Sequence, residues 1–345
     1  MKPLDIQTVR RIVPELLEVL QSRVRVLQRV LLLQPIGRRA LAQEMHVTER
    51  ILRAELDFLR QQGLLTTSVA GVSLSDEGIR LLNELEGAVA SVEGRDELGK
   101  AVSRHLGIPE VIVVAGDCDH DDWVRDNMGY RAALCLQGLL HENDVLAVTG
   151  GSTVAAIANR MPTVKIPLGI KVVPARGGVG ETVEMQANTV ASRLAQRLGG
   201  ASVMLHVPDR LTEQTLEQLL SDEFVQERLQ EIRQATVVVH GIGEALQMAQ
   251  RRNATEEERE ILRREQAVAE AFGYYFREDG EVAYAMTTVG LRLSDLPKMR
   301  TVIAVAGGSE KARAVSAAAK AYRIDILVTD EGTASSLICT QSTPG

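Results

Sequence analysis

The sequence predicts two domains of different class, a small α+β domain at the N-terminus and a larger α/β domain after it. Within residues 1–75, helical patterns precede two short β-prone runs, whereas from residue 96 onward short apolar runs alternate with amphipathic helices. Charge divides the chain at nearly the same place. Residues 1–75 hold 11 Lys and Arg against 7 Asp and Glu, and in the remainder 28 basic residues face 39 acidic ones. A basic head on an acidic body is typical of a chain with one end that meets nucleic acid.

The first 75 residues have the pattern of a winged helix-turn-helix domain. A long amphipathic helix begins after Pro14, and after a Pro-Ile-Gly break a short helix over 38–44 and another over 49–61 follow. Two β-prone runs at 64–68 and 72–74 then predict a hairpin, and three helices before a small hairpin are the order of that fold. The apolar positions expected to face the core are Leu16, Leu20, Val24, Leu27 and Leu31 in the first helix and Ile51, Leu52, Leu56 and Leu59 in the last.

The helix over 49–61 is the candidate recognition helix. Thr48 has the residue type of an N-cap, and the N-terminal residues of a recognition helix enter the major groove. We therefore expect Thr48, Arg50 and Arg53 to contact bases and phosphates, because arginine binds both guanine edges and phosphate oxygens. Arg38 and Arg39, at the start of the preceding helix, are expected to lie over the DNA backbone. The alternative is a protein-interaction module with solvated arginines.

Residues 76–94 are predicted to form a helix that links the two domains. The spacing of Leu82, Leu85, Val89 and Val92 is that of a short coiled-coil seam. The seam is too short to dimerise alone, but on an already dimeric body it would hold two DNA-binding heads at a fixed distance. A helix packed on its own body is the competing interpretation.

Residues 95–345 are predicted to form an α/β domain with a mostly parallel, doubly wound sheet. Strands of such a sheet are buried on both faces, so they appear as continuous apolar runs between helices. Ligands bind outside the carboxyl ends of the strands. The predicted strands cover residues 111–114, 145–148, 170–173, 202–205, 236–239, 301–305 and 326–328, and the helices between them include 124–140, 186–198, 224–235 and 311–322.

Three glycine-containing turns follow strands of this sheet, at 150–153, 175–180 and 306–311. Glycines at the start of a helix let the backbone approach an anion, and the N-terminus of the helix attracts it. The turns therefore predict a site for an anionic ligand. Neither a Walker pattern nor a complete dinucleotide fingerprint is present, since residues 240–244 lack the third glycine, so a phosphorylated metabolite is favoured over a nucleotide. The residues that the turns bring to the site are Gly150, Gly151, Ser152, Thr153, Arg176 and Lys311.

Composition excludes several other classes of protein. Cys118, Cys135 and Cys339 are scattered, which favours reduced thiols over a disulfide framework. No apolar run approaches the roughly 18 residues of a membrane span, so we expect a cytoplasmic protein without a membrane partner. The acidic run at 117–122 is expected to be a solvated loop, because consecutive residues cannot all face one metal ion. We expect no metal and no cofactor.

Several motifs make the sequence resemble the SorC/DeoR-like family of bacterial sugar-responsive repressors, almost from end to end. A serine at 152 replaces a threonine of the family pattern, and Gln34 replaces a glutamate; the hydroxyl at 152 is kept. The motifs are QPIGRR at 34–39, VTGGST at 148–153, VPARGGVGE at 173–181, QANT at 186–189, HGIGEA at 240–245, MAQRRN at 248–253, EAFGYYF at 270–276, AVAGG at 304–308 and VTDEG at 328–332.

The resemblance implies a body with the fold of glucosamine-6-phosphate deaminase and ribose-5-phosphate isomerase, used to sense a ligand rather than to catalyse. It implies a repressor of the glycolytic operon that contains glyceraldehyde-3-phosphate dehydrogenase, relieved by fructose-1,6-bisphosphate. The partners implied are operator DNA, the sugar bisphosphate and further copies of the chain, as a dimer and on DNA a tetramer.

The resemblance also implies roles for residues of the pocket. One phosphate would be held by the turn at 150–153 together with Gly308 and Lys311, and the other by Arg176 and Arg251. Gln186 and Glu270 would bind the sugar hydroxyls.

Two rival functions remain open from the sequence. A regulator that answers a monophosphate such as deoxyribose-5-phosphate would need only one anion site. A sugar-phosphate isomerase or deaminase would need a general base, for which Asp117, His120, Asp330 and Glu270 are the candidates by position. Asp330 comes directly before a predicted helix, so a role in capping that helix is the simpler interpretation.

Overall fold

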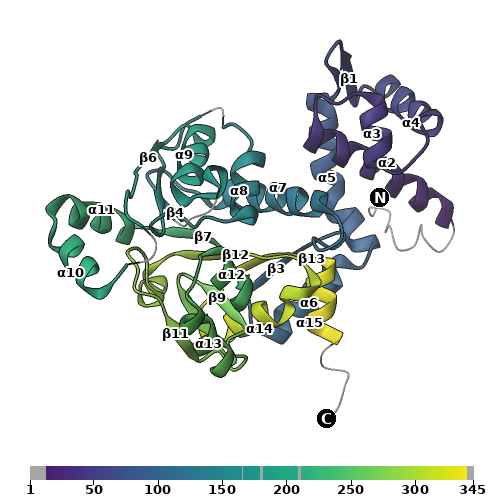
Figure 1. Cartoon of the computed structure of the whole chain (residues 1–345). Coiled ribbons are helices and arrows are strands. Elements are labelled where there is room, and N and C mark those ends of the chain that lie inside the picture. The colour runs from purple at the N-terminus through teal and green to yellow at the C-terminus, as the bar shows by residue number, and fades with distance from the viewer. Residues whose placement is uncertain (1–12, 165, 179–181, 209–210, 340–345) are drawn as a thin grey trace. The chain divides into compact units, whose positions relative to one another are not determined.

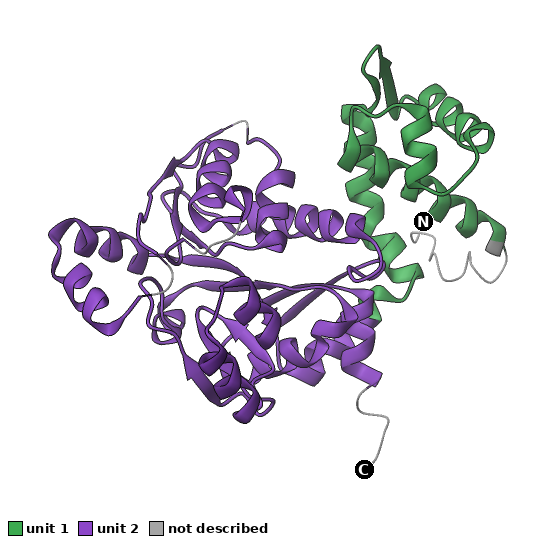
Figure 2. Cartoon of the chain, viewed as in Figure 1, with its two compact units in different colours: residues 1–97 green, residues 98–345 purple. Residues whose placement is uncertain are grey.

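The computed structural model describes residues 13–339, apart from residues 165, 179–181 and 209–210. The chain divides into two compact units, Met1–Glu97 and Leu98–Gly345 (Figure 2). Val179 and Gly180 of the second glycine turn lie outside the described residues. The predicted linker helix is part of the N-terminal unit.

The described residues of the N-terminal unit form three helices, then a two-stranded antiparallel hairpin, then a long helix (Figure 1). The bounds of the second and third helices are those predicted, because the Thr48 cap and Gly63 after the helix are strong local signals. The elements are α2 (Pro14–Leu33), α3 (Arg38–Glu44), α4 (Glu49–Gln61), β1 (Leu65–Ser68), β2 (Gly71–Leu74) and α5 (Asp76–Val92).

Two residues of the predicted core face solvent instead. Leu16 and Ile51 are each 55% exposed, and Leu17 is buried in place of Leu16. One residue corresponds to about 100° around a helix, so the predicted apolar faces were too wide at these positions. Leu52 and Leu56 of α4 are buried as predicted.

The apolar seam of α5 belongs to the core of the N-terminal unit. Leu82 and Val89 are buried, and together with Leu85 they pack into the apolar cluster that contains Val24 and Leu27 of α2. Three of the four seam residues therefore belong to the core of this unit and do not form a face open to a partner helix.

The C-terminal unit is built on a seven-stranded sheet in which every pairing is parallel, as predicted. The strand order is β3-β13-β12-β7-β4-β5-β6. The predicted strand over 202–205 is shorter than expected, because the ladder ends at Ser202. The strands are β3 (Glu110–Val114), β4 (Val145–Val148), β5 (Lys171–Pro174), β6 (Ala201–Ser202), β7 (Val237–Gly241), β12 (Thr301–Val305) and β13 (Ile326–Asp330).

Helices cover both faces of this sheet (Figure 1). One apolar cluster joins the sheet to α7 (Asp122–Leu139), α8 (Ser152–Arg160) and α9 (Ala187–Leu198). The other joins it to α6, α11, α14 and α15. The remaining helices are α6 (Arg95–Leu106), α10 (Glu213–Ser221), α11 (Glu223–Arg233), α12 (Ala245–Arg251), α13 (Glu256–Arg264), α14 (Ala312–Ala321) and α15 (Glu331–Cys339).

A second, antiparallel sheet was not predicted from the sequence. Its order is β11-β10-β9-β8, and its strands are two to four residues long. Such short strands are too brief for an alternating pattern to be recognised. The strands are β8 (Gly243–Glu244), β9 (Ala269–Ala271), β10 (Tyr274–Phe276) and β11 (Val282–Ala285).

At the amino end of the parallel sheet, Asp144 joins the starts of three strands. Its carboxylate receives two hydrogen bonds from Arg300, at 2.8 and 2.7 Å, and one from the Thr236 hydroxyl at 2.7 Å. Burial by itself would raise the pKa of Asp144, but the hydrogen bonds from Arg300, the His141 N–H and Thr236 outweigh it and bring the pKa to about 2. The ionised carboxylate is therefore the form that the fold stabilises.

Asp144→Asn should lower the free energy of unfolding by about 2 kcal/mol at neutral pH. The pKa in the folded chain lies below the unfolded value of about 3.9, so this stability is present above pH 4 and is lost as the pH falls toward 2. Urea unfolding at pH 7 and pH 3 measures the difference. Asp122→Asn is the control, because the Asp122 side chain is 90% exposed. Equal losses for both variants, or a loss that does not shrink in acid, would contradict this account.

Candidate functional site

A pocket opens at the carboxyl edge of the parallel sheet, with about 760 Å³ of empty space that is partly open to solvent. Loops after β4, β5 and β7 meet there with α12 and the second sheet. Eight of the ten residues expected to bind the effector line it. They are Gly150, Gly151, Ser152, Thr153, Arg176, Arg251, Glu270 and Lys311.

The first glycine turn forms one wall of the pocket. Gly150 packs against the backbone of the loop before α9, so a Cβ there would lie 2.5 Å from the Met185 carbonyl oxygen. Gly151 has φ +104°, a conformation that other residues rarely adopt, and the helix α8 begins at the next residue, Ser152. The first N–H groups of a helix have no carbonyl partner within it, so those of Ser152 and Thr153 are available to an anion.

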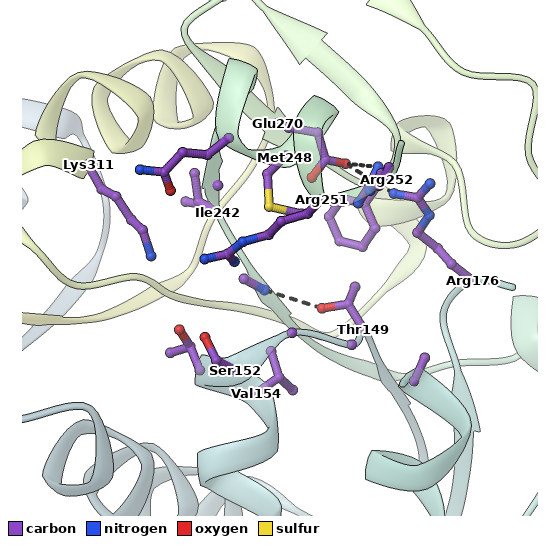
Figure 3. A pocket seen from close by; sticks show the side chains of 18 of the residues that line it. Thr149, Ser152, Val154, Arg176, Ile242, Met248, Arg251, Arg252, Glu270 and Lys311 are labelled. Atoms are coloured by element: carbon purple, nitrogen blue, oxygen red, sulfur yellow. Dashed lines mark hydrogen bonds and ion pairs between the residues drawn. The ribbon is translucent and has the colours of Figure 1, made fainter. Parts of the chain in front are cut away.

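Lys311 and Arg251 project into the space beside this helix start (Figure 3). Burial lowers the pKa of Lys311, and the nearby Arg251 guanidinium lowers it further. Two cations that repel one another over the N-terminus of α8 form a site that an anion would stabilise.

A buried ionic cluster occupies the other side of the pocket. Arg176 Nη1 and Arg252 Nη1 lie 3.0 and 2.9 Å from Glu270 Oε1, and the Gly273 N–H donates to the same oxygen at 2.8 Å. All three side chains are less than one-tenth exposed. Burial by itself would raise the pKa of Glu270, but the charges of Arg252 and Arg176 outweigh it and hold the pKa below its usual value.

The cluster contains Arg252, an arginine to which the resemblance assigned no role. Arg251 was expected beside Arg176, but the structure places Arg252 there and Arg251 on the side of Lys311 (Figure 3). Both arginines end the helix α12, where a shift of one residue turns a side chain by about 100°. The two neighbouring arginines therefore face different parts of the pocket. The orientation of α12 decides which of them lies beside Glu270.

Gln186 and Gly308 are not among the residues that line the pocket. Gln186 is the residue before α9. The Gly308 N–H donates to Asp330 Oδ2 at 2.7 Å, so the amide expected to meet a phosphate is bonded within the chain.

The acidic loop at 117–122 covers the third glycine turn. Asp117 Oδ1 accepts from the Ser309 N–H at 3.3 Å, and Asp119 Oδ2 accepts from the Glu310 N–H at 3.0 Å. Residues 119–122 are exposed, as expected of a solvated loop, and the carboxylates of Asp117 and Asp119 in addition accept from backbone donors that precede α14. Lys311 is the residue of this turn that reaches the pocket.

Asp330 is fully buried and has a structural role. Its Oδ2 accepts from the N–H groups of Cys118 and Gly308, and its Oδ1 accepts from the Thr333 N–H at 2.9 Å in the first turn of α15. The predicted capping of this helix is confirmed. Both oxygens are occupied by backbone donors, which leaves this carboxylate unsuited to act as a general base.

The lining of the pocket also contains apolar residues. They include Ile242, Met248 and Phe272, which the sequence did not single out as lining residues. Phe272 packs on His240, with ring centroids 4.6 Å apart. Burial lowers the pKa of His240 to about 4, so this ring is neutral at pH 7 and adds no charge to the pocket. Only the folding of the second sheet against the first brings these residues together.

In the N-terminal unit, the side chains expected to meet DNA are all exposed, namely Arg38, Arg39, Thr48, Arg50 and Arg53. The N-cap is confirmed, because Thr48 Oγ1 accepts from the Ile51 N–H at 3.4 Å. Arg39 lies 3.5 Å from Glu49 but is 90% exposed. Across the described part of the chain, no acidic group pairs with Arg38, Arg50 or Arg53.

Two further findings concern the described residues as a whole. They contain no group of three or more His, Cys, Asp and Glu side chains placed to hold a metal ion. None of their helices combines the length and apolarity that crossing a bilayer requires.

Two family models match consecutive parts of the chain. The CggR N-terminal DNA binding domain matches residues 19–89, and a sugar-binding domain matches residues 90–339. The central glycolytic genes regulator of Priestia megaterium is 42% identical over 335 residues, which cover 96% of this chain and 98% of that protein. The regulator of the same name from Bacillus subtilis is 40% identical over 333 residues, with the same coverage of 96% and 98%.

Solved structures agree with these matches. A SorC family transcriptional regulator from Enterococcus faecalis is 39% identical, with a TM-score of 0.66 over 70% of this chain and 99% of that one. The full-length sorbitol operon regulator SorC from Klebsiella pneumoniae has a TM-score of 0.69 over 91% of this chain and 98% of its own, at 19% identity, which shows a shared fold.

These relatives are transcriptional regulators, and the two matched domains bind DNA and sugars, so the chain is a regulator and not an enzyme. The DNA-binding head, the sugar-binding body and the near-complete coverage by relatives of 40–42% identity place this chain in the family of the central glycolytic genes regulators, within the wider SorC group.

Proposed function

We propose that the chain represses glycolytic genes from an operator that its N-terminal unit binds, and that fructose-1,6-bisphosphate in the pocket weakens this binding. The protein would act in the cytoplasm without a cofactor, as a dimer that assembles to a tetramer on DNA. The observation that supports a bisphosphate as the ligand is a pocket with a cationic group on each of two sides.

The charge balance of the pocket favours two phosphates over one. Arg176, Arg251, Arg252 and Lys311 line it against the single carboxylate of Glu270, which leaves a formal charge of +3. Two phosphate groups at pH 7 carry about −3 to −4, whereas one carries about −1.5 to −2. A monophosphate would leave one cationic side without compensation.

Each phosphate has a distinct place in this proposal. One would lie over the start of α8, held by the N–H and hydroxyl groups of Ser152 and Thr153 and by Lys311 and Arg251. The other would bind Arg176 and Arg252, whose guanidinium groups Glu270 already orients. We assign the Glu270 carboxylate, which lines the pocket between these groups, to a sugar hydroxyl between the two phosphates.

The N-terminal unit would bind as a winged helix-turn-helix, with α4 in the major groove and the β1–β2 hairpin as the wing. Thr48, Arg50 and Arg53 would enter the groove, and Arg38 and Arg39 would contact the DNA backbone. The exposed pair of Arg39 with Glu49 contributes little and yields readily to a phosphate.

Fructose-1,6-bisphosphate should weaken DNA binding roughly 5- to 150-fold, because allosteric coupling is typically about 1–3 kcal/mol. Fluorescence anisotropy with a labelled duplex that the chain has enriched from a random-sequence library measures the effect. Lys311→Ala and Arg176→Ala should blunt the response and leave DNA affinity without ligand unchanged. Arg176→Ala should also lower thermal stability, because it removes a partner of buried Glu270.

Arg313→Ala is the matched control for these variants, since Arg313 is an exposed residue of α14 that pairs with Glu278. Its response to the ligand should equal that of the unaltered chain. A response that survives both pocket substitutions, or a DNA affinity that the ligand does not change, would refute the proposal.

In contrast to the pocket variants, Arg53→Ala should weaken DNA binding and leave ligand binding unchanged. DNA binding should weaken about tenfold or more through loss of a base or phosphate contact, while the bisphosphate still raises the unfolding temperature as in the unaltered chain. Arg80→Ala is the control, because Arg80 is exposed on α5 and pairs with Glu77. If Arg53→Ala binds DNA normally, α4 does not enter the groove as proposed.

A thermal-shift panel tests the number of phosphates. At 100 times its Kd, a ligand stabilises the folded state by about 2.7 kcal/mol, so ligands can be ranked by the concentration that produces a given shift. Fructose-1,6-bisphosphate should act at lower concentration than deoxyribose-5-phosphate or other monophosphates. A monophosphate that ranks first would favour the rival, monophosphate-responsive regulator.

A further inference from the structure

An apolar strip lies on the outward face of α4 and consists of Ile51, Ala54 and Phe58. Ile51 is 55% and Phe58 38% exposed, and Ala54 is exposed as well. Spacings of three and four residues put these side chains on one face of the helix, opposite the buried Leu52 and Leu56. The strip is therefore not part of the core of the N-terminal unit, although sequence periodicity assigned Ile51 to that core.

The two ends of the strip differ in their surroundings. At its C-terminal end, the Arg23 guanidinium lies over the Phe58 ring, 3.8 Å from the centroid, and Arg23 Nε donates to Glu55 at 2.9 Å. This cation–π contact accounts for Phe58 within the unit itself. Ile51 and Ala54 lie toward the N-terminal end, where the helix begins at its Thr48 cap.

The charge around Ile51 and Ala54 indicates what covers them. Arg50 and Arg53 are exposed on the same helix, and among the described residues no carboxylate neutralises either one. A partner for this surface must therefore supply negative charge at its edges and small apolar groups between them. Duplex DNA does both, because phosphates flank a major groove in which the C5-methyl group of thymine is exposed.

We infer that Ile51 and Ala54 read thymine methyl groups, so that α4 selects its site by apolar contact as well as through its arginines. The inference rests on the proposed entry of α4 into the major groove and adds a specificity determinant to it. The Thr48 cap supports it geometrically, because the hydrogen bond from the Ile51 N–H to Thr48 Oγ1 holds the first turn of the helix in place. The partner so identified is a thymine at a defined position of each half-site.

Replacement of single thymines by deoxyuridine tests this, because it removes only the methyl group and keeps the base pair. The full-length chain first enriches a duplex from a random-sequence library, and anisotropy then gives the Kd for each duplex with one uracil. At one or two positions of each half-site, uracil should weaken binding about fourfold, the factor expected for one buried methyl group. At all other thymines the affinity should not change.

Ile51→Ala should weaken binding to the thymine duplex and remove the difference between thymine and uracil at one of those positions. Arg53→Ala should weaken binding to both duplexes and keep that difference. Val19→Ala is the matched control, because Val19 is a 43% exposed aliphatic residue on α2, outside the strip. Thermal unfolding of each variant should match the unaltered chain, since the truncated side chains are largely exposed.

The experiment distinguishes a failure of the proposed DNA-binding role of α4 from a failure of this inference alone. A chain that enriches no duplex would overturn the role of α4 in DNA binding and this inference with it. A chain that enriches a duplex but binds every uracil variant equally would overturn the inference alone. So would an Ile51→Ala variant that keeps the thymine preference and changes only the oligomeric state in light scattering, because the strip would then contact protein.

Discussion

The buried carboxylate of Asp330 holds the functional end of the parallel sheet together. It receives N–H groups from Cys118 and Gly308 and caps α15 through Thr333, so a single side chain joins three loops that are far apart in sequence. A buried carboxylate without such donors would carry a large desolvation cost. The three loops are therefore positioned together, and with them Lys311 at the rim of the pocket.

Backbone N–H groups that are bonded to carboxylates in this way are not available to an anion. Among the described residues, the first glycine turn presents backbone N–H groups at the start of α8. In the second turn Gly177 and Gly178 donate to the carbonyl oxygens of Val289 and Val207, and the N–H groups of the third turn are bonded to Asp117, Asp119 and Asp330. The proposed phosphate is therefore assigned to the start of α8, with side-chain cations around it. The third glycine turn therefore positions Lys311, and its own backbone N–H groups are not available to an anion.

Glu270 holds two arginines in place, as Asp330 holds three loops, at the proposed position of the second phosphate. It lies between Arg176 and Arg252 and fixes their guanidinium groups before any ligand arrives. Pre-organised cations reduce the conformational entropy that binding must overcome. One buried acid between two arginines also leaves a net positive charge, as the proposed binding of a phosphate requires.

Much of the fold could be predicted from sequence because its signals are local. Buried parallel strands such as β4 and β12 are continuous apolar runs, and α4 is bounded by the Thr48 cap and by Gly63. The second sheet could not be predicted, since its strands are too short for a pattern and are stabilised by pairing with distant residues.

By itself, the sequence determined the residue types of both functional surfaces, with arginines on a capped helix and glycine turns after apolar strands. Tertiary structure alone decided which of these groups meet. The orientation of α12 placed Arg252 rather than Arg251 against Glu270, and the rotation of α4 exposed Ile51. Both depend on the direction in which a side chain leaves its helix, and at about 100° per residue that direction is set by the packing of the whole element rather than by the residue type.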